Sequence, residues 1–276
     1  MTEFATPEHA TPFDLAHAAM EAAPEEDAAR LALYHLLADT ELYLLLEVEP
    51  EDADITPQVF ETEEGDFVMA FDLEERLAEF TGMPAPYAAL PGRVIAEKLV
   101  GHEVGLGINL GVADSAMLLP PEALEWLAET LTQAPEAASG RPVAFHPPAL
   151  GPGPLSALLT AFQAKFTHLA GLASHALLAG VTYEGGGRGH ILAFLGAAPQ
   201  SEPALAKAVA EALTFSGLEA AQIDVTFITT EDPAAEAILK AAQVIALPEP
   251  ASAEAPTENA APKGPGMDPS KPPILR

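Results

Sequence analysis

The residues most suggestive of chemistry in this sequence form an acidic run whose oxygen-bearing side chains approach the spacing of a calcium-binding loop. The candidate ligands are Asp52, Asp54, Thr56, Gln58 and Glu63. Pro57 stands where such a loop needs a glycine for its sharp turn, and the flanking residues predict strands instead of helices. We interpret this run as a solvated acidic loop and assign no metal site to it.

The histidines are the next candidates, because imidazole serves both as a metal ligand and as a general base. No pair of them forms the His-Glu-x-x-His pattern that places two imidazoles and a carboxylate on one helical face. His17 and Glu21 lie four apart on an expected helix, a spacing typical of a surface pair. A zinc site built from distant histidines stays open as an alternative, with no residue assigned to it.

Nucleophilic catalysis finds no support in the sequence. The chain has no cysteine, which excludes thiolate catalysis, disulfides and cysteine-based metal centres. No serine lies in a Gly-x-Ser-x-Gly turn, and the adjacent Ser174 and His175 would point to opposite faces of an expected strand. We assign no catalytic residue and expect a protein that is not an enzyme.

Two glycine-rich segments, 105–111 and 185–189, have the composition of phosphate-binding loops. The first lacks the third glycine of a dinucleotide fingerprint and is not followed by a helix. The second contains Arg188 but lacks the Lys-Ser/Thr of a P-loop. A strand and a hairpin turn are the better interpretations, and no cofactor is implied.

Negative charge is the clearest surface signal. Residues 31–75 contain 14 Asp or Glu and no Lys or Arg, yet the run is also strongly apolar, so it must fold with its acids outside. Four acids cluster at one expected hairpin tip, and we select them as candidate partner-binding residues: Glu61, Glu63, Glu64 and Asp66. The alternative, that this tip only confers solubility, stays open.

Net charge also limits the classes of partner. The formal charge is −29, and residues 1–132 hold 28 acids against 4 Lys or Arg. Such a field repels phosphate backbones and anionic lipids, so we expect no nucleic-acid or membrane binding, whereas a basic protein partner fits. The N-terminal residues lack the pattern of a secretory signal, and a cytoplasmic location is expected. Nothing in the sequence specifies an oligomeric state.

Helical and strand patterns alternate through the first half and predict an α+β domain. We expect helices at 14–22, 25–38, 72–80, 93–100 and 122–131, and strands at 41–48, 58–61, 67–71, 105–110 and 116–119. Asp14 and Asp72 are expected to cap helices. The first three strands are expected to form a meander, and the proline-rich segment 82–91 an ordered loop.

A second α+β domain is expected after a segment rich in Pro, Ala and Gly. Its expected elements are helices at 155–166, 203–217 and 233–242 and strands at 172–183, 190–195, 223–228 and 244–247, with a short strand at 143–146 before them. The chain then divides into a flexible N-terminus (1–12), a first domain (13–132), a linker (133–154), a second domain (155–248) and a disordered tail (249–276). The predicted fold class is α+β, with two mixed-sheet domains and helices packed on the sheets.

Core segments of the first domain resemble the N-terminal domain of the SseB family, named for enhanced serine sensitivity. The resemblance rests on residues 38–47, 67–72 and 105–109 and on the closing helix with Leu124 and Leu127. Residues 155–250 are similar to the C-terminal domain that often accompanies it. The family commonly has Asn-Pro-Gly after the glycine-rich strand, whereas this chain has Asn109-Leu110-Gly111. The resemblance implies a cytosolic α+β protein and no active site.

These observations favour a non-enzymatic, cytoplasmic protein-interaction or regulatory protein. A second interpretation is a small-molecule sensor or weak enzyme with a ligand cleft between the two domains, in which His102, Asn109 or Arg188 supply polar contacts. The two interpretations differ in whether a deep polar pocket lies between the halves.

Overall fold

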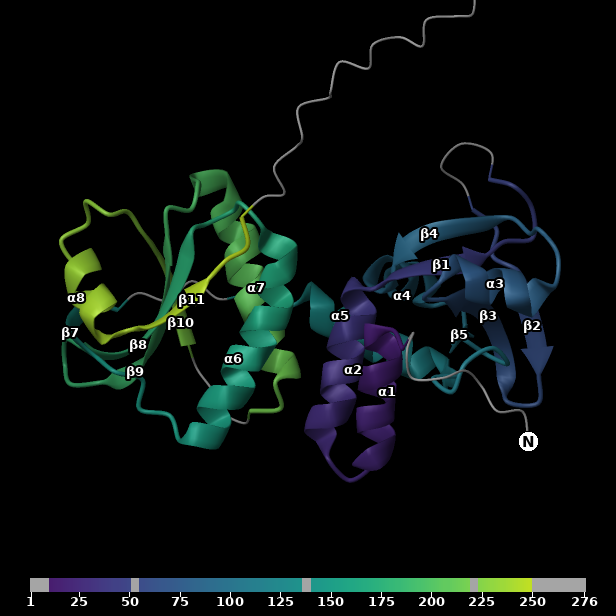
Figure 1. Cartoon of the computed structure of the whole chain (residues 1–276), viewed down its shortest axis with the longest axis horizontal. Helices are drawn as coiled ribbons and strands as arrows, with labels where there is room; N and C mark the ends of the chain where they lie inside the picture. Colours follow the sequence, from purple (N-terminus) through teal and green to yellow (C-terminus); the bar gives the residue numbers. More distant parts are fainter. Residues whose placement is uncertain (1–9, 51–54, 136–139, 219–222, 250–276) are drawn as a thin grey trace, which may run out of the picture.

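The computed structural model describes residues 10–50, 55–135, 140–218 and 223–249. These residues form two α+β units, each built on one mixed sheet, as the sequence predicts (Figure 1). The first unit contains the helices α1 (Pro12–Ala22), α2 (Asp27–Asp39), α3 (Glu74–Thr81), α4 (Gly92–Leu99) and α5 (Pro121–Thr132) and the strands β1 (Glu41–Leu45), β2 (Val59–Thr62), β3 (Gly65–Phe71), β4 (Tyr87–Pro91), β5 (Val104–Ile108) and β6 (Met117–Leu119).

The second unit follows after residue 140. It contains β7 (Pro142–His146), α6 (Pro152–Phe166), the 3-10 helix η2 (Thr167–Leu169), β8 (His175–Tyr183), β9 (Arg188–Leu195), the 3-10 helix η3 (Pro199–Ser201), α7 (Glu202–Phe215), β10 (Ile223–Ile228), α8 (Ala235–Ala241) and β11 (Gln243–Ala246). β7 comes from the segment expected to be a linker, and it pairs with β8. The expected N-terminal flexible segment and C-terminal tail fall largely on residues outside the described ranges, although α1 already begins at Pro12.

The first sheet has the order β4-β1-β3-β5-β6, with β2 paired to β3. β3 and β5 are parallel, and the other pairs are antiparallel. The expected meander is wrong, because β1 and β2 both pair with β3: β1 with its end at Ala70 and Phe71, and β2 with its start. A seven-residue strand is long enough to accept both, and β2 pairs with the part of β3 that β1 leaves unpaired.

The proline-rich segment 82–91 contains a strand where an ordered loop is expected. Its second half is β4, which pairs with β1 at the edge of the sheet. Pro91 ends this strand, and an edge position suits a residue that has no backbone N–H to donate. Proline content therefore hid a strand that begins in the short apolar run at residues 87–90.

The glycines of β5 have a structural role. Gly105 pairs with Phe67 and Gly107 with Met69, so these four residues share one face of the sheet. A Cβ added at Gly107 would lie 2.6 Å from the Met69 sulfur, and one at Gly105 would collide with the Phe67 ring. The glycines therefore leave space for two large side chains to lie across the neighbouring strand. Phe67 and Met69 are buried as a result.

The helix caps differ from those expected. Thr11 is the N-cap of α1, and Asp14 is the third helical residue, forming a reciprocal capping box with it. Asp72 does not cap α3; it accepts hydrogen bonds from Arg76 Nη1 at 2.7 Å and from Thr11 Oγ1 at 2.6 Å. Burial works to raise the pKa of Asp14, but hydrogen bonds from Arg76, Ser115 and Thr11 lower it to about 2.

The second sheet has the order β10-β9-β8-β11, with β7 also paired to β8. β9 and β10 are parallel, whereas β8 and β9 form the expected hairpin. α6 and α7 pack on one face through a core that includes Leu158, Phe162 and Leu205, and α8 packs on the other through Ile238. Both faces of this sheet are therefore covered.

Helices α2, α6 and α7 lie between the two sheets, whereas α8 lies on the far side of the second sheet and α3 packs on the outer face of the first (Figure 1). α2 of the first unit packs against α7 of the second. Phe215, the last residue of α7, belongs to the hydrophobic core of the first unit. Its ring stacks on His35 with centroids 5.1 Å apart and meets Trp126 edge-on at 6.1 Å. The two sheets are thus joined through shared core packing.

Gly105→Ala should destabilise the first unit by roughly 1 to 3 kcal/mol, because the new methyl group would displace the Phe67 ring and press on the Leu119 carbonyl. Denaturant unfolding followed by circular dichroism measures this. Gly187→Ala is the matched control, since Gly187 is exposed, has no positive φ and its Cβ would meet nothing within 4 Å, so the effect should be small. Equal effects of the two substitutions would contradict this role for Gly105.

Candidate functional site

The four acids selected from the sequence lie on the β2–β3 hairpin, and all four side chains are exposed. Glu61 and Asp66 are directly opposite each other across the two strands, while Glu63 and Glu64 occupy the turn. No Lys or Arg within the described ranges forms an ion pair with them. This tip therefore carries uncompensated negative charge. Like charges placed directly opposite each other also destabilise a hairpin.

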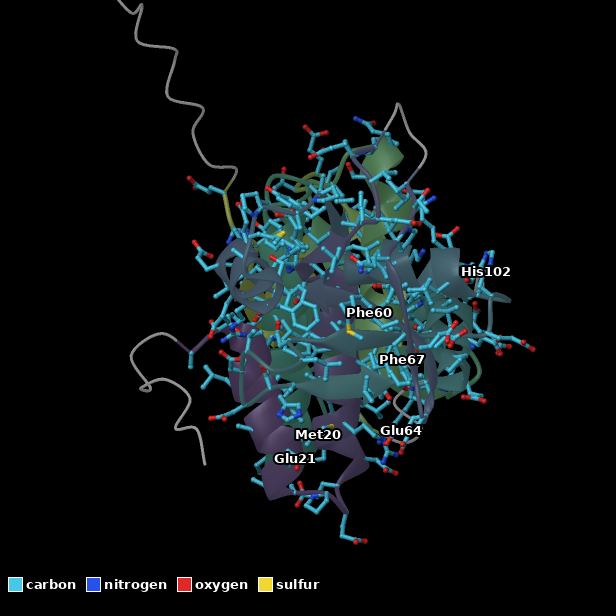
Figure 2. All side chains as sticks on the ribbon, turned by 90° about the vertical axis from the view of Figure 1, so that its right-hand side faces the viewer. Met20, Glu21, Phe60, Glu64, Phe67 and His102 are labelled. Atoms are coloured by element: carbon cyan, nitrogen blue, oxygen red, sulfur yellow. The ribbon has the colours of Figure 1, made fainter. Side chains whose placement is uncertain are left out.

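An aromatic surface adjoins the hairpin. Phe60 and Phe67 are the next cross-strand pair, and they pack with other aromatic and apolar residues on the outer face of the first sheet: Tyr43, Phe71, Leu77, Phe80 and Tyr87. Tyr43, Phe60, Phe80 and Tyr87 remain partly exposed. Figure 2 shows Phe60 and Phe67 near the middle of this end of the molecule, with Glu64 below them.

The acidic and the aromatic side chains of the two hairpin strands lie on opposite faces of the sheet. Residues one apart on a strand point to opposite sides, so Glu61 and Asp66 project from the face opposite to Phe60 and Phe67. Glu63 and Glu64 lie at the end that both faces share. The four acids are therefore close together in the chain fold, but only the turn pair borders the aromatic surface directly.

A second cluster of charges, which sequence reasoning missed, lies between the two units. Asp39 and Arg93 come from the first unit, and Lys165 and Glu211 come from the second. Lys165 Nζ lies 2.7 Å from Asp39 Oδ2 and 2.5 Å from Glu211 Oε2. Arg93 donates two hydrogen bonds of 3.1 Å to the Glu211 carboxylate and also pairs with Asp39. We call these four residues the interface ion cluster.

Helix geometry explains how these residues meet. His35 and Asp39 are four apart on α2, and Glu211 and Phe215 are four apart on α7, so each helix presents a polar and an aromatic contact on one face. Gly92 begins α4 so close to the Leu37 carbonyl that a Cβ would collide with it, and this approach places Arg93 beside Asp39. The charged Lys165 and Glu211 lie among the apolar residues of α6 and α7, a pattern that signals a buried partner.

The interface ion cluster is largely removed from water. The Lys165 and Glu211 side chains are 6% and 4% exposed. Burial works to raise the pKa values of Asp39 and Glu211, but Lys165 and Arg93 hold both below their usual range. Two positive and two negative charges therefore compensate each other within the low-dielectric interface.

His35 lies beside this cluster as a neutral imidazole. Burial, together with the charge of Lys165, lowers its pKa to about 4, in spite of Asp39 and Glu211 nearby. Its Nε2 atom is buried and has no hydrogen-bond partner among the described residues. A cavity of about 590 Å³ adjoins it between α2 and α6, lined in part by Ala32, Asp39, Ala161 and Lys165.

The polar contacts proposed for a ligand cleft between the domains are wrong, because the structure places those residues elsewhere. His102 lines a separate, mostly apolar cavity of about 360 Å³ in the first unit. Asn109 is fully buried, donating from Nδ2 to Ser115 Oγ at 3.1 Å and accepting from the Asp72 N–H. Arg188 lines a cavity on the second sheet. The cavity between the units is lined instead by His35 and by Asp39 and Lys165 of the interface ion cluster.

Asp52 and Asp54 of the acidic loop lie outside the residues that the structure describes. Within the described ranges, no cluster of three or more His, Asp or Glu side chains has an arrangement that could hold a metal ion. None of the helices that the structure describes is long and apolar enough to cross a membrane.

The first unit is an α+β domain in which a mixed six-stranded sheet packs its inner face on helices and leaves aromatic side chains on the outer one. Residues 15–126, which span this sheet and most of its helices, match the family model of the SseB protein N-terminal domain. The first unit of this chain is therefore similar to the SseB N-terminal domain over these residues. Neither a search of the curated proteins nor a search of the solved structures found a match. The C-terminal SseB domain expected at 155–248 lies outside the matched residues and stays a prediction.

Lys165→Met should destabilise the protein by roughly 3 kcal/mol, because it leaves Asp39 and Glu211 buried without their shared ammonium group. Lys207→Met is the matched control: Lys207 is 46% exposed and lies 3.9 Å from the same carboxylate, so its loss should cost less than about 1 kcal/mol. Thermal and urea unfolding measure both. Equal losses for the two variants would show that the interface ion cluster does not hold the units together.

Stability should fall between pH 7 and pH 5 by roughly 2 kcal/mol through His35. Its pKa is about 4 in the folded chain and ordinary, near 6.5, in the unfolded chain, so the unfolded state takes up the proton first as the pH drops. The loss begins near pH 6.5 and is complete near pH 4. Urea titrations of the wild type and of His35→Leu should differ in this interval. An identical pH dependence in His35→Leu would refute the assignment.

Proposed function

We propose that this protein is a non-enzymatic, cytoplasmic protein-interaction or regulatory component whose SseB N-terminal domain binds a basic polypeptide through the β2–β3 hairpin and the adjoining aromatic surface. The observation that carries the proposal is an exposed hairpin without cationic partners, whose turn residues Glu63 and Glu64 border partly exposed aromatic residues. The partner we propose combines Lys or Arg residues with apolar side chains.

Electrostatics supports a basic partner. An opposed acid pair costs a hairpin roughly 0.2 to 1 kcal/mol, and Glu63 and Glu64 at the turn add further repulsion. A partner's cations would relieve this repulsion on binding, so part of the binding energy would come from the unfavourable charge of the free hairpin. The same field would accelerate association with a basic surface, an effect that salt screens.

The aromatic surface supports a protein or peptide partner over a small ion. Aromatic side chains supply much of the binding energy in protein interfaces, whereas acids mainly steer the encounter. Phe60 contacts Phe80 of α3 edge-on at 6.0 Å, and Tyr43 contacts Tyr87 in the same way at 5.4 Å. The rings are thus held in place before any partner arrives, which lowers the entropy lost on binding.

The non-enzymatic part of the proposal is supported by the use of the polar groups in the first unit. Asp14, Arg76, Asn109 and Ser115 form one hydrogen-bonded network that joins α1 to α3 and to the turn after β5. Asp14 accepts from Arg76, from Ser115 Oγ at 2.5 Å and from the Thr11 N–H at 2.9 Å. These groups satisfy each other, as is typical of structural networks.

Neutralising the hairpin should abolish partner binding while leaving the fold more stable. In the variant with Glu61→Thr, Glu63→Gln, Glu64→Gln and Asp66→Thr, the repulsion is removed and the melting temperature should rise. Pull-downs from lysate at low and high salt, analysed by quantitative mass spectrometry, should then lose proteins of high basic content that the wild type retains at low salt only.

The matched control removes four acids elsewhere on the first unit, by changing Glu97, Glu122, Glu125 and Glu129 to Gln, and it should keep those proteins. Phe60→Ser should also weaken their recovery at low salt, since it removes an apolar contact. The proposal fails if the hairpin variant retains every protein that the wild type captures, or if the control variant loses the same proteins.

A further inference from the structure

A cavity of about 760 Å³ opens at one end of the second sheet. This volume lies within the range of small-molecule sites. One side of the cavity is apolar and is formed by Leu150, Leu158 and Leu218; the opposite side is the sheet itself, with His146, Gly180, Arg188 and His190. The proposed protein interaction uses the other unit and does not involve this cavity.

The sheet face that lines the cavity changes character along its length. Leu178 of β8 and Leu192 of β9 are directly paired and belong to the core beneath α6 and α7. Two residues further along the same face, the corresponding pair is Gly180 and His190, and the next pair is Thr182 and Arg188. A core-facing surface that becomes polar inside a cavity indicates a site for a polar ligand group.

Register brings two imidazoles to this surface. His146 of β7 pairs with Gly180 of β8, and Gly180 pairs with His190 of β9, so the two histidines flank the glycine on one face. A Cβ at Gly180 would stand 3.0 Å from the Pro147 carbonyl oxygen, closer than almost all real Cβ contacts. Glycine therefore lets the backbone of residues 146 and 147 pack closely against β8.

One of these imidazoles has an unused polar atom. His190 Nε2 is buried and has no hydrogen-bond partner in the part of the chain that the structure describes. His146 Nε2, by contrast, is 3.2 Å from Thr182 Oγ1. A buried polar atom without a partner is destabilising unless another group satisfies it. An acceptor or donor on a bound molecule would provide that partner.

Nitrogen-bearing side chains line this cavity of an otherwise acidic protein. Arg188 forms no ion pair with any described residue, although the chain carries 41 acids against 12 Lys or Arg. Asp224 is the acid that lines the cavity, and its carboxylate accepts a hydrogen bond from the Tyr183 hydroxyl. One guanidinium and two imidazoles thus face the cavity together.

We propose that this cavity binds a small phosphate monoester with an apolar body. The phosphate group would lie beside His190 and take hydrogen bonds from Arg188 and from His190 Nε2, while the apolar body would lie against Leu150, Leu158 and Leu218. A phosphate offers three acceptor oxygens to the three nitrogen-bearing side chains, which is more than a carboxylate provides, and a guanidinium binds it in two-point geometry.

Isothermal titration calorimetry on the full chain tests the proposal with phenyl phosphate as the probe. Phenyl phosphate should bind about tenfold or more tightly than either inorganic phosphate or phenol, because only it fills both halves of the cavity. Arg188→Gln and His190→Phe should each weaken its binding by about tenfold or more. Arg30→Gln is the matched control, since Arg30 pairs with the exposed Asp27 on α2 of the other unit and should leave binding unchanged.

Circular dichroism and melting temperature establish that each variant remains folded. Binding that survives Arg188→Gln and His190→Phe, or phenol that binds as tightly as phenyl phosphate, overturns the proposal. Benzoate binding equal to that of phenyl phosphate overturns the choice of phosphate. A failure here leaves the hairpin interaction unaffected, because the two surfaces lie on different units.

Discussion

The arrangement of the whole chain depends on compensating four buried charges at once. Desolvating a carboxylate or an ammonium group costs several kcal/mol, and the cost is recovered only when each charge has opposite charges at bonding distance. Asp39, Arg93, Lys165 and Glu211 meet this condition only in one relative position of α2, α4, α6 and α7. Phe215 adds an apolar constraint one turn from Glu211. The two sheets therefore have a defined mutual placement even though they are separate layers.

Most elements of the fold could be predicted from the sequence, because their apolar periodicity is local information. The exceptions have specific physical causes. β4 was hidden by the prolines around it, since an edge strand tolerates a residue that a central strand excludes. The pairing of β1 with β3 could not be read locally, because strand partners are chosen by the whole sheet. Asp14 was placed at the wrong cap position because Thr11, three residues earlier, is an equally good capping residue.

The functional surfaces also differ in how far the sequence predicts them. The acidic hairpin was visible because its four acids lie within six residues of one another, and the structure adds that Glu61 and Asp66 are opposed. In the interface ion cluster, Arg93 and Lys165 lie 54 and 126 positions from Asp39 along the chain. No pattern predicts such pairs, although a lysine between Phe162 and Phe166 was a signal that a buried partner exists. The cavity of His146 and His190 needed the register of three strands, which sequence alone does not provide.

Phe215 has a further consequence for how this protein is divided. The residues that match the SseB N-terminal domain end at 126, yet one of the side chains that complete its core comes from a helix that ends at 215. A fragment cut at the family boundary would expose Trp126 and His35 where that ring now lies. The segment that matches the family model is thus smaller than the folded unit that buries its own apolar surface. Fusing this domain to another chain would require an apolar side chain that replaces Phe215 in its core.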